Sequence, residues 1–416
     1  MGRDKAILQY LERYGEPLHP YAAALSQSIS AAWQQALVIP AARENDAFVR
    51  RLQQAPQSHS CLFVLVLNGP AGMAQTDGEL TLQPLTFLQS ASTPHYRSDD
   101  GFITLFHHGQ HDFLVINLLQ PPTQDFHQHG VGYARKLGMD LCLHLYAAAR
   151  LSSPWVRSSD ADVIWPDDYF LPLAADDHCS AMLYPFRHEQ VDARHETDAA
   201  AAALYDFWLR YYVEGLRQSG SPWAFHTIGS TLAIHLRHYA INRGFPKREA
   251  GEDFYLLNKL AKTGTVISLQ APTLLLSNRI SDRTPFGTGH AIGKIASQPA
   301  HSRHWPFYHP EIFTQLKIWH TWLPRLYDQE PLPTTLTQQP IYPVLLELGL
   351  ERTLQHCRRQ CRKPEQFTRH LWQWFDAAMT RKCVHLLRDR RFGTVSFAEL
   401  QVIQEQREDG PCLEMA

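Results

Sequence analysis

Two aspartates separated by one residue are the first candidates for chemistry. In the stretch VRSSDADVIWPDDYF, residues 156–170, Asp160 and Asp162 directly follow a run that predicts a strand. Carboxylates rarely lie inside a protein unless they are paired or bind a cation. Two carboxylates at a strand end can hold Mg²⁺ or Mn²⁺ and leave coordination positions for the phosphate oxygens of a substrate. The alternative is an ordinary solvated turn, which is the commoner meaning of an isolated Asp-x-Asp.

A second acidic pair, Glu252 and Asp253, begins a predicted helix in AGEDFYLLNKL. Acidic residues are favoured in a first helical turn by the helix dipole, so this pair could simply be structural. A carboxylate in that place could also face a cleft and take a proton from an attacking hydroxyl. The residues alone leave both interpretations open.

The elements that would position these groups alternate between strands and helices. Short apolar runs that predict strands occur at residues 36–39, 61–67 and 113–119, and a fourth strand ends at the acidic pair. Helical patterns follow the first and third runs. This alternation predicts an α/β sheet over residues 35–170, and in such sheets ligands gather at the carboxyl ends of the strands. Asp160 and Asp162 are therefore predicted to lie where a ligand is expected.

The remainder of the chain changes character near residue 300. Before that point we expect further helices and one more strand, and after it a series of helices with aromatic faces. We therefore expect an N-terminal helix (1–30), a sheet domain (31–300) and a C-terminal α-helical domain (301–416). The aromatic stripe is predicted to be core, with a lid, a sugar-stacking wall or a homodimer face as alternatives. Its members are Trp319, Trp322, Trp372 and Trp374.

Taken in order, the motifs over residues 35–290 resemble family-2 glycosyltransferases with the Rossmann-like GT-A fold. LVIPAARE looks like their opening strand and nucleotide-binding turn, GVGYARKLGMD like their helix after the nucleotide-contacting loop, and SSDADV like their Asp-x-Asp. The segment from FHTIGS to AGEDF looks like their acceptor region with its Glu-Asp pair. The resemblance implies a transferase that moves a sugar from a nucleotide-diphosphate donor to an acceptor hydroxyl, with Mn²⁺ or Mg²⁺ as cofactor.

The resemblance also implies roles for particular residues. Asp160 and Asp162 would hold the metal, and Asp253, or else Glu252, would be the general base of an inverting displacement. The donor would be lined by Pro40, Ala41, Glu44, Asn68 and Arg135, with Arg135 near the base or diphosphate. The acceptor side would be formed by Trp223, His226, Gly229 and Ser230. Asn68 stands where the family usually has an aspartate that reads the base, so the donor's base stays open.

A glycine-containing stretch after the acceptor segment, SNRISDRTPFGTGHAIGK, adds three candidates. Arg279 and Arg283 are candidate phosphate clamps, because arginine presents a rigid fork of donors. His290 would add a nitrogen ligand to the metal, which would leave retention of configuration open. An exposed glycine turn with scattered charges is the alternative.

Composition limits the class of protein. Lys and Arg number 39 and Asp and Glu 41, so the formal net charge is 39 − 41 = −2, which gives no support to nucleic-acid binding through overall charge. Seven scattered cysteines, a charged N-terminus and the absence of a long apolar stretch predict a cytoplasmic protein without a membrane span. Two rivals remain: a nucleotidyltransferase of related fold, and a non-catalytic scaffold that binds a nucleotide-sugar. The acceptor is open between a small molecule, a glycan and a protein.

Overall fold

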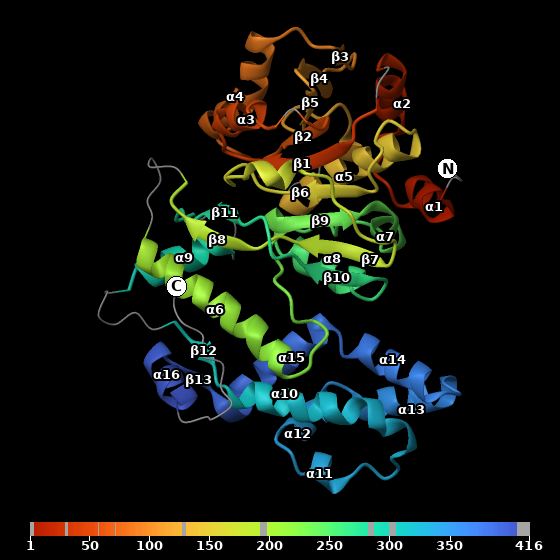
Figure 1. The fold of residues 1–416 in the computed structure, drawn as a ribbon, viewed down its shortest axis with the longest axis vertical. Coiled ribbons are helices and arrows are strands. Elements are labelled where there is room, and N and C mark those ends of the chain that lie inside the picture. The colour runs from red at the N-terminus through yellow and green to blue at the C-terminus, as the bar shows by residue number, and fades with distance from the viewer. Residues whose placement is uncertain are drawn as a thin grey trace. The chain divides into compact units, whose positions relative to one another are not determined.

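The computed structural model describes residues 4–29, 32–56, 58–70, 72–126, 130–191, 198–281, 287–298 and 305–405. The chain divides into two compact units (Figure 1). The sheet unit comprises residues 1–195, 227–278 and 282–287, and the helical unit comprises residues 196–226, 279–281 and 288–416. The predicted α/β class is confirmed to the extent that the chain combines a large mixed sheet with many helices.

The sheet unit is built on a mixed sheet, which has nine strands within the described residues, in the order β10-β7-β9-β6-β1-β2-β5-β4-β3. Strands β1, β2, β5 and β6 run parallel to their neighbours in this group, whereas β9 is antiparallel to both β6 and β7. The strands are β1 (Gln35–Ala41), β2 (Cys61–Leu67), β3 (Tyr96–Arg97), β4 (Ile103–His108), β5 (His111–Asn117), β6 (Trp155–Ser158), β7 (Cys179–Leu183), β9 (Leu232–His235) and β10 (Thr265–Ser268).

The direction of winding changes between β1 and β6. From β1 the chain builds outward through β2 to β5, and then returns to place β6 on the other side of β1. In open α/β sheets such a switch point leaves a crevice at the carboxyl ends of the strands. The topology therefore makes the ends of β1 and β6 the expected position for a ligand.

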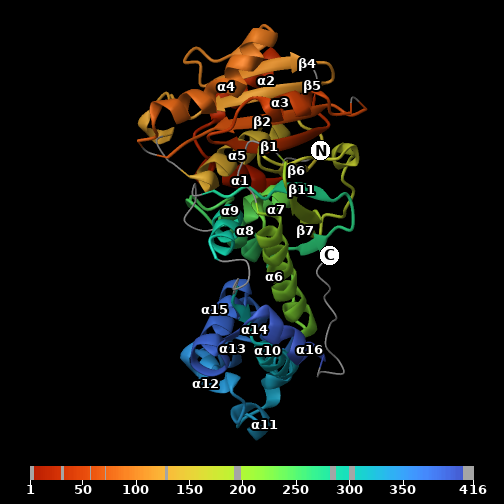
Figure 2. The same cartoon turned by 90° about the vertical axis from the view of Figure 1, so that its left-hand side faces the viewer.

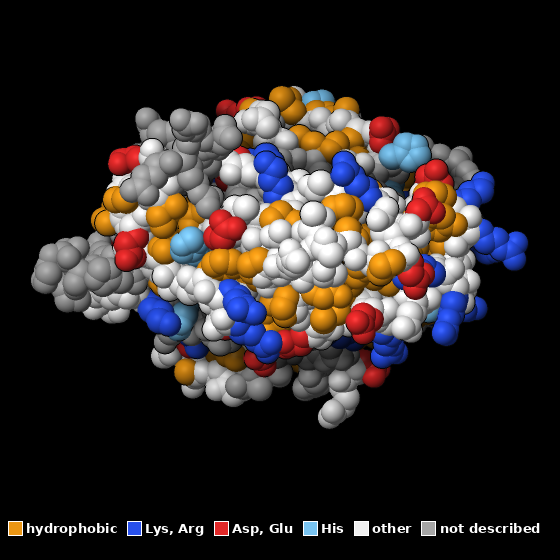
Figure 3. Space-filling view, turned by 90° about the horizontal axis from the view of Figure 1, so that it is seen from below, with side chains coloured by type: hydrophobic (Ala, Val, Ile, Leu, Met, Phe, Trp, Pro, Cys, Tyr) orange, Lys and Arg blue, Asp and Glu red, His pale blue; other side chains and the backbone are white. Residues whose placement is uncertain are grey.

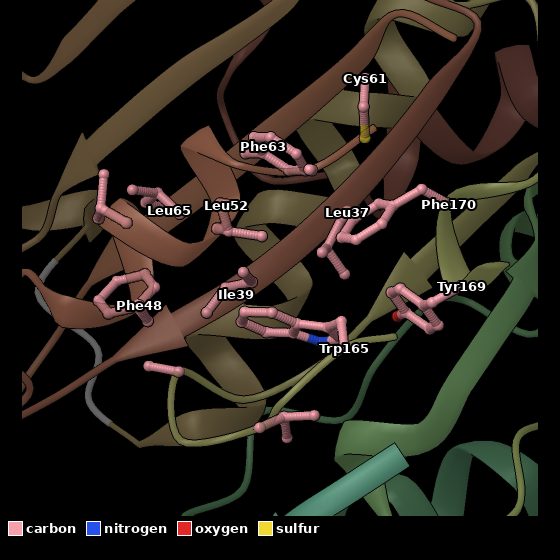
Figure 4. Close-up of a cluster of buried hydrophobic side chains, with 14 of the residues drawn as sticks. Leu37, Ile39, Phe48, Leu52, Cys61, Phe63, Leu65, Trp165, Tyr169 and Phe170 are labelled. Carbon is pink, nitrogen blue, oxygen red and sulfur yellow. The ribbon is translucent and has the colours of Figure 1, made fainter. Parts of the chain in front are cut away.

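Both central strands are buried along their whole length, as expected for parallel strands covered on two faces. One face packs against α3 (Ala47–Gln53) and against the segment that follows Asp162 (Figure 4). The side chains of this layer include Leu37 and Ile39 of β1, Phe63 and Leu65 of β2, Phe48 and Leu52 of α3, and Trp165, Tyr169 and Phe170.

The opposite face of the central strands is covered by α5 (Val131–Ala147). Gly138 of this helix lies so close to β1 that an added Cβ would be 2.5 Å from Cγ1 of Val38 and 3.2 Å from Cγ2 of Val66. A side chain here would push the helix off the sheet. The glycine thus sets the position of α5, which carries Arg135 and Lys136.

The rest of the sheet unit consists of helices and a small second sheet. Strands β8 (Phe186–Glu189) and β11 (Leu274–Ser277) pair in parallel. The predicted N-terminal helix is present as α1 (Lys5–Arg13), but it packs against α5 and α7 as part of the sheet unit. The other helices are α2 (His19–Ser28), α4 (Gln75–Ala91), α7 (Leu236–Ile241) and α8 (Glu252–Leu260).

The helical unit has its own aromatic core. Trp319 is fully buried and packs edge-on against Trp374, with ring centroids 6.2 Å apart. Trp322 and Trp372 are partly buried against the same core, so the aromatic stripe is packing between helices. The elements are α6 (Ala199–Gln218), α9 (Thr288–Ala296), β12 (Phe307–Tyr308), α10 (Glu311–Trp322), α11 (Thr334–Thr337), α12 (Ile341–Glu347), α13 (Leu350–Gln360), α14 (Pro364–Trp374), α15 (Ala377–Leu387), β13 (Thr394–Val395) and α16 (Phe397–Glu405).

Helix α6 departs from the expected division at residue 300, because it clusters with the C-terminal helices (Figure 2). Phe207 packs edge-on against Phe307, and the hydroxyl of Tyr211 donates to the Tyr308 carbonyl at 2.7 Å. These contacts join segments almost a hundred residues apart, which the local pattern of α6 does not reveal. The helical unit is therefore discontinuous in sequence.

Charge is mixed on the face seen from below (Figure 3). Hydrophobic side chains gather near its centre, and Lys, Arg, Asp and Glu side chains lie around them without separating by sign. In the described part of the chain no helix combines the length and the apolar character that crossing a bilayer requires.

Candidate functional site

The carboxyl edge of the central strands brings three predicted segments together. The backbone N–H of Asn68, just after β2, donates to the carbonyl of Ala41 at the end of β1 (2.9 Å). Ser158 at the end of β6 pairs with Leu232 at the start of β9. Because β9 is antiparallel, the residues that precede it, Gly229 and Ser230, lie at this same edge. The Asp-x-Asp turn, Asn68 and part of the predicted acceptor segment thus share one edge of the sheet.

The turn that carries Asp160 and Asp162 is held from both sides. The indole of Trp165 donates to Oγ of Ser159 at 2.9 Å, just before the turn. From α3, Nη2 of Arg51 donates to the carbonyl of Ala161, between the two aspartates, at 3.0 Å. The backbone under both carboxylates is therefore fixed.

The segment after the turn is fixed to the sheet by a buried arginine of β6. Nη2 of Arg157 donates to the carbonyl of Leu171 and Nη1 to Oε1 of Gln35, both at 2.5 Å. Asp167 and Asp168, the other two acids of the stretch, are exposed in a short 3₁₀ helix. They belong to the solvated turn, whereas Asp160 faces a buried cation.

That cation is Arg135 of α5, whose side chain lies at the centre of the site with only 2% of its surface exposed. Its Nε donates to Oε1 of Glu252 at 3.0 Å, and Nη2 donates to Oδ1 of Asp160 at 2.5 Å. Nη1 donates to Oγ of Ser158 at 2.8 Å and to the carbonyl of Ser159 at 3.2 Å. Burial alone would lower the pKa of the guanidinium, but Asp160 and Glu252 outweigh it and hold that pKa above its ordinary value. Arg135 thus joins the end of β6 to the start of α8.

Gly229 is shaped by this arginine. A Cβ added to Gly229 would lie 2.8 Å from Nη2 of Arg135 and 3.1 Å from its Cζ. The guanidinium is held by hydrogen bonds to its acceptors and cannot move aside without breaking those bonds. Glycine is therefore required here by close approach, which gives the predicted acceptor-side residue a structural reason.

Asp253 differs from its neighbour Glu252 in exposure, and its own pKa is shifted. Glu252 is buried against Arg135, whereas Asp253 keeps part of its surface exposed while protein surrounds it on most sides. Desolvation, and then the charge of Glu252, raise the pKa of Asp253 to about 7. Hydrogen bonds from the amides of Phe254 (2.7 Å) and Gly229, and the charge of Arg135, act in the opposite direction. Asp253 can therefore gain and lose a proton near neutral pH.

The donor set at the Asp-x-Asp turn suits a hard divalent cation bound together with a substrate. The side chain of Asp160 is 39% exposed and Asp162 is half-buried, so both can reach solvent. Among the described residues there is no cluster of three or more His, Cys, Asp or Glu side chains placed to bind a metal. Mg²⁺ commonly uses one or two carboxylates and completes its octahedron with water and phosphate oxygens. The chemistry of the two aspartates fits that mode.

The predicted donor residues lie around the end of β1, with one change of role. Pro40 and Ala41 are the last two residues of β1 and are buried, and Glu44 is half-buried in the following loop. Asn68 is 7% exposed. Arg135 was expected beside the base or diphosphate, but its guanidinium is occupied by protein acceptors. Arg135 contacts Asp160 and Glu252, and its role toward a donor stays a prediction.

Trp223 and His226 belong to the helical unit rather than to the unit that carries the acidic groups. The indole of Trp223 donates to the carbonyl of Phe375 at 2.8 Å, which makes it part of the helical core. Burial, followed by the charges of Arg210 and Arg217, lowers the pKa of His226 to about 4. Their acceptor role stays a prediction.

The remaining candidates come from the stretch after β11. Arg279 is half-buried, and His290 is exposed on α9; both lie in the helical unit. Arg283 lies outside the described residues. The metal and clamp roles of this stretch stay predictions.

Sequence reasoning missed two contributors to this edge. Ser158 supplies a hydroxyl to Arg135, and Arg43, in the loop after β1, has an unusual backbone conformation. The serine stands beside the recognised Asp-x-Asp and could have been flagged as a neighbour. The conformation of Arg43 leaves no local signal.

No protein-family model matches this sequence, and a search of curated proteins finds no significant match.

Proposed function

We propose that this protein is a metal-dependent glycosyltransferase of GT-A type, which moves a sugar from a nucleotide-diphosphate donor to an acceptor hydroxyl with inversion. The observation that carries the proposal is the buried Arg135, which holds Asp160 and Glu252 together at the switch point between β1 and β6. One guanidinium thereby links the candidate metal turn to Glu252, the residue next to the candidate base Asp253.

The donor half of the proposal relies on the Asp-x-Asp turn. Asp160 and Asp162 would hold Mg²⁺ or Mn²⁺ against the diphosphate, and Asn68 with the end of β1 would contact the nucleoside. The cation would supply positive charge that stabilises the departing nucleoside diphosphate. The fixed backbone around Ala161 and Ser159 keeps this arrangement from reorganising during the reaction.

Asp253 is the group best suited to activate the acceptor. In an inverting displacement the acceptor oxygen forms a bond to the anomeric carbon while the bond from that carbon to the diphosphate oxygen breaks. The proton of the acceptor hydroxyl passes to a carboxylate oxygen of Asp253. A base is most effective when its pKa lies near the working pH, and the pKa of Asp253 is raised to about 7.

Glu252 is the weaker choice for the base, because its carboxylate is buried and held by Arg135 at 3.0 Å. Taking a proton would weaken that ion pair inside the protein, which is unfavourable. We assign Glu252 to positioning Arg135 and to raising the proton affinity of its neighbour.

The proposal is tested by thermal unfolding with a panel of nucleoside diphosphates and their sugars, with and without Mn²⁺. Wild type is compared with Asp162→Ala and with a matched control, Asp167→Ala, which removes an exposed aspartate of the same segment. Ligand at about 100 times its Kd should stabilise the folded state by roughly 2.7 kcal/mol. We expect a metal-dependent shift for one base, lost in Asp162→Ala and kept in Asp167→Ala.

A folded protein that responds to none of these donors would contradict the transferase assignment. Binding without turnover in the presence of varied acceptors would favour the scaffold alternative. Consumption of a nucleoside triphosphate with release of pyrophosphate would favour the nucleotidyltransferase.

A further inference from the structure

Arg43 combines a rare backbone conformation with a position at the switch point. It lies two residues after Ala41, the last residue of β1, and its φ angle is 55°. This left-handed region is uncommon for a side chain as large as arginine, because the Cβ approaches the following carbonyl. Strain of this kind persists only where the surrounding structure imposes it, and it concentrates at ligand sites.

Helix α4 imposes the conformation through two of its residues. The amide of Arg43 donates to Oγ1 of Thr81 at 2.9 Å, and that hydroxyl donates to the carbonyl of Asp77 at 2.7 Å. The Oδ2 atom of Asp77 lies 2.8 Å from Nε of Arg43. Thr81 is fully buried, so the anchor is rigid. The backbone and the side chain of Arg43 are thus both held by α4.

The guanidinium keeps access to solvent. The side chain of Arg43 is 35% exposed, and the contact with Asp77 that the structure describes is made through Nε, one of its five N–H donors. The terminal nitrogens form the planar fork that suits phosphate oxygens. An arginine held by a carboxylate in this way is oriented before a ligand arrives.

A separate observation indicates a ligand beside this loop. Asn68 is 7% exposed, and among the described residues no partner accompanies its buried Oδ1 atom. The backbone N–H of Asn68 donates to the carbonyl of Ala41. Asn68 therefore lies beside the end of β1, and Arg43 is two residues after Ala41 in the chain. Buried polar atoms nearly always have a partner in a native complex. The edge therefore presents an unfilled acceptor and a pre-oriented cation from neighbouring strand ends.

We infer that Arg43 is a donor-binding residue whose guanidinium, oriented by Asp77, contacts the phosphate oxygens of the nucleotide. The inference rests on the proposed function, since it assumes a nucleotide-diphosphate donor at this edge. Thr81 and Asp77 are positioning residues that act through Arg43. The segment between β2 and β5, which carries α4, then has a part in donor binding.

The test uses glycine, which relaxes the strained backbone while removing the guanidinium. In Arg43→Gly the unliganded protein should melt at the wild-type temperature or above, because glycine adopts positive φ freely. Its Kd for the preferred nucleoside diphosphate with Mn²⁺, measured by calorimetry on the full chain, should rise about 10- to 100-fold. Asp77→Asn should raise the same Kd less, by about threefold to tenfold.

Arg243→Gly is the matched control. Arg243 also has a positive φ, 62°, but its guanidinium stacks on Tyr14 at 4.5 Å from the ring centroid. The same substitution there should leave the nucleotide Kd unchanged.

Two results would overturn the inference, and they are distinguishable. If wild type binds a nucleoside diphosphate and Arg43→Gly binds it with a Kd within twofold, the inference fails while the proposed function stands. If wild type binds none of the nucleoside diphosphates UDP, GDP, ADP, CDP and dTDP, the inference and the proposed function fail together.

Discussion

Arg135 and Lys136 are adjacent in α5, yet they organise two networks of opposite character. Arg135 faces the carboxyl edge of the sheet, where Asp160 is 39% exposed and Asp253 is partly exposed. Lys136 faces α1 and α7, and every charged group that it meets is buried. We call the first the open network and the second the closed network.

The closed network is fully paired around Asp140. Lys136 Nζ donates to Oδ2 of Asp140 at 2.9 Å, and the hydroxyls of Tyr10 and Tyr239 donate to Oδ1 at 2.6 and 2.8 Å. The amide of Glu16 donates to Oδ2 at 2.9 Å. Burial and the charge of Asp140 hold the pKa values of both tyrosines above their ordinary range. This network ties α1 to α5 and α7.

The comparison separates stability from function. A buried network with every donor and acceptor satisfied fixes a structure and offers a substrate nothing. A network whose carboxylates reach the surface, one of them with its pKa shifted toward neutral pH, is typical of functional sites. Changes in the closed network should therefore affect folding, and changes in the open network should affect chemistry.

The largest expected effect is the loss of turnover in the Asp253→Asn variant. Removal of the base should lower the turnover of the donor about 10²- to 10⁴-fold, because an amide cannot accept the acceptor's proton. Release of nucleoside diphosphate from the nucleotide-sugar measures this rate, with water as acceptor if no other is known. Nucleotide affinity should stay within a few-fold of wild type.

Asp168→Asn is the control for that variant, since it changes an exposed aspartate outside the network. Turnover of Asp253→Asn at the wild-type rate would remove Asp253 from the mechanism.

Lys136→Met should break the closed network. It leaves Asp140 buried without its cation, whereas Glu16 keeps Lys247 at 2.8 Å, so we expect a loss of about 3–5 kcal/mol in the free energy of unfolding. Urea unfolding followed by circular dichroism measures the loss. The remaining folded protein should keep its turnover per molecule. Unchanged stability would show that the closed network does not hold α1 in place.

The shifted pKa of Asp253 should make stability depend on pH. The folded pKa is raised from 3.8 to about 7, so between these values the folded protein holds a proton that the unfolded chain has released. The stabilisation is complete below pH 4 and is lost as pH rises through 7. Unfolding free energies of wild type relative to Asp253→Asn should fall by about 3 kcal/mol from pH 4 to pH 7 and then level off. A difference that is constant across this range would mean that the carboxyl is not shifted.

Gly229→Ala should give the smallest of these effects. The new Cβ would push the Arg135 guanidinium from its acceptors, at a cost of about 1–3 kcal/mol in stability and a measurable loss of turnover. Gly78→Ala in α4 is the control, because its Cβ would meet only Cε of Met73, at 3.9 Å, and helix propensity should improve. Equal stability changes in the two variants would contradict the close approach at Gly229.

The sequence predicted the parts of the fold that depend on local pattern. The apolar runs around Val38 and Val64 mark β1 and β2, because strands buried on both faces need unbroken apolar residues. The helix after Gly130 and the position of Asp160 at a strand end followed from the same patterns. Strand β9 was not recognised, because its four residues are too short to show a period.

The roles of charged residues could not be predicted, because they depend on pairing across the chain. Lys136 and Asp140 stand four residues apart, as solvent-exposed pairs on helices commonly do, but here they are buried beside Tyr10 and Tyr239. Arg135 meets Glu252 across 117 residues of sequence. No local signal announces either contact.

The most direct test of the central claim is a calorimetric titration of Mn²⁺ into the protein saturated with its preferred nucleoside diphosphate. We expect one Mn²⁺ bound per chain in wild type and in the folded fraction of the Lys136→Met variant, and none in the Asp162→Ala variant. Equal Mn²⁺ binding by Asp162→Ala and wild type, or no binding by wild type, would contradict it.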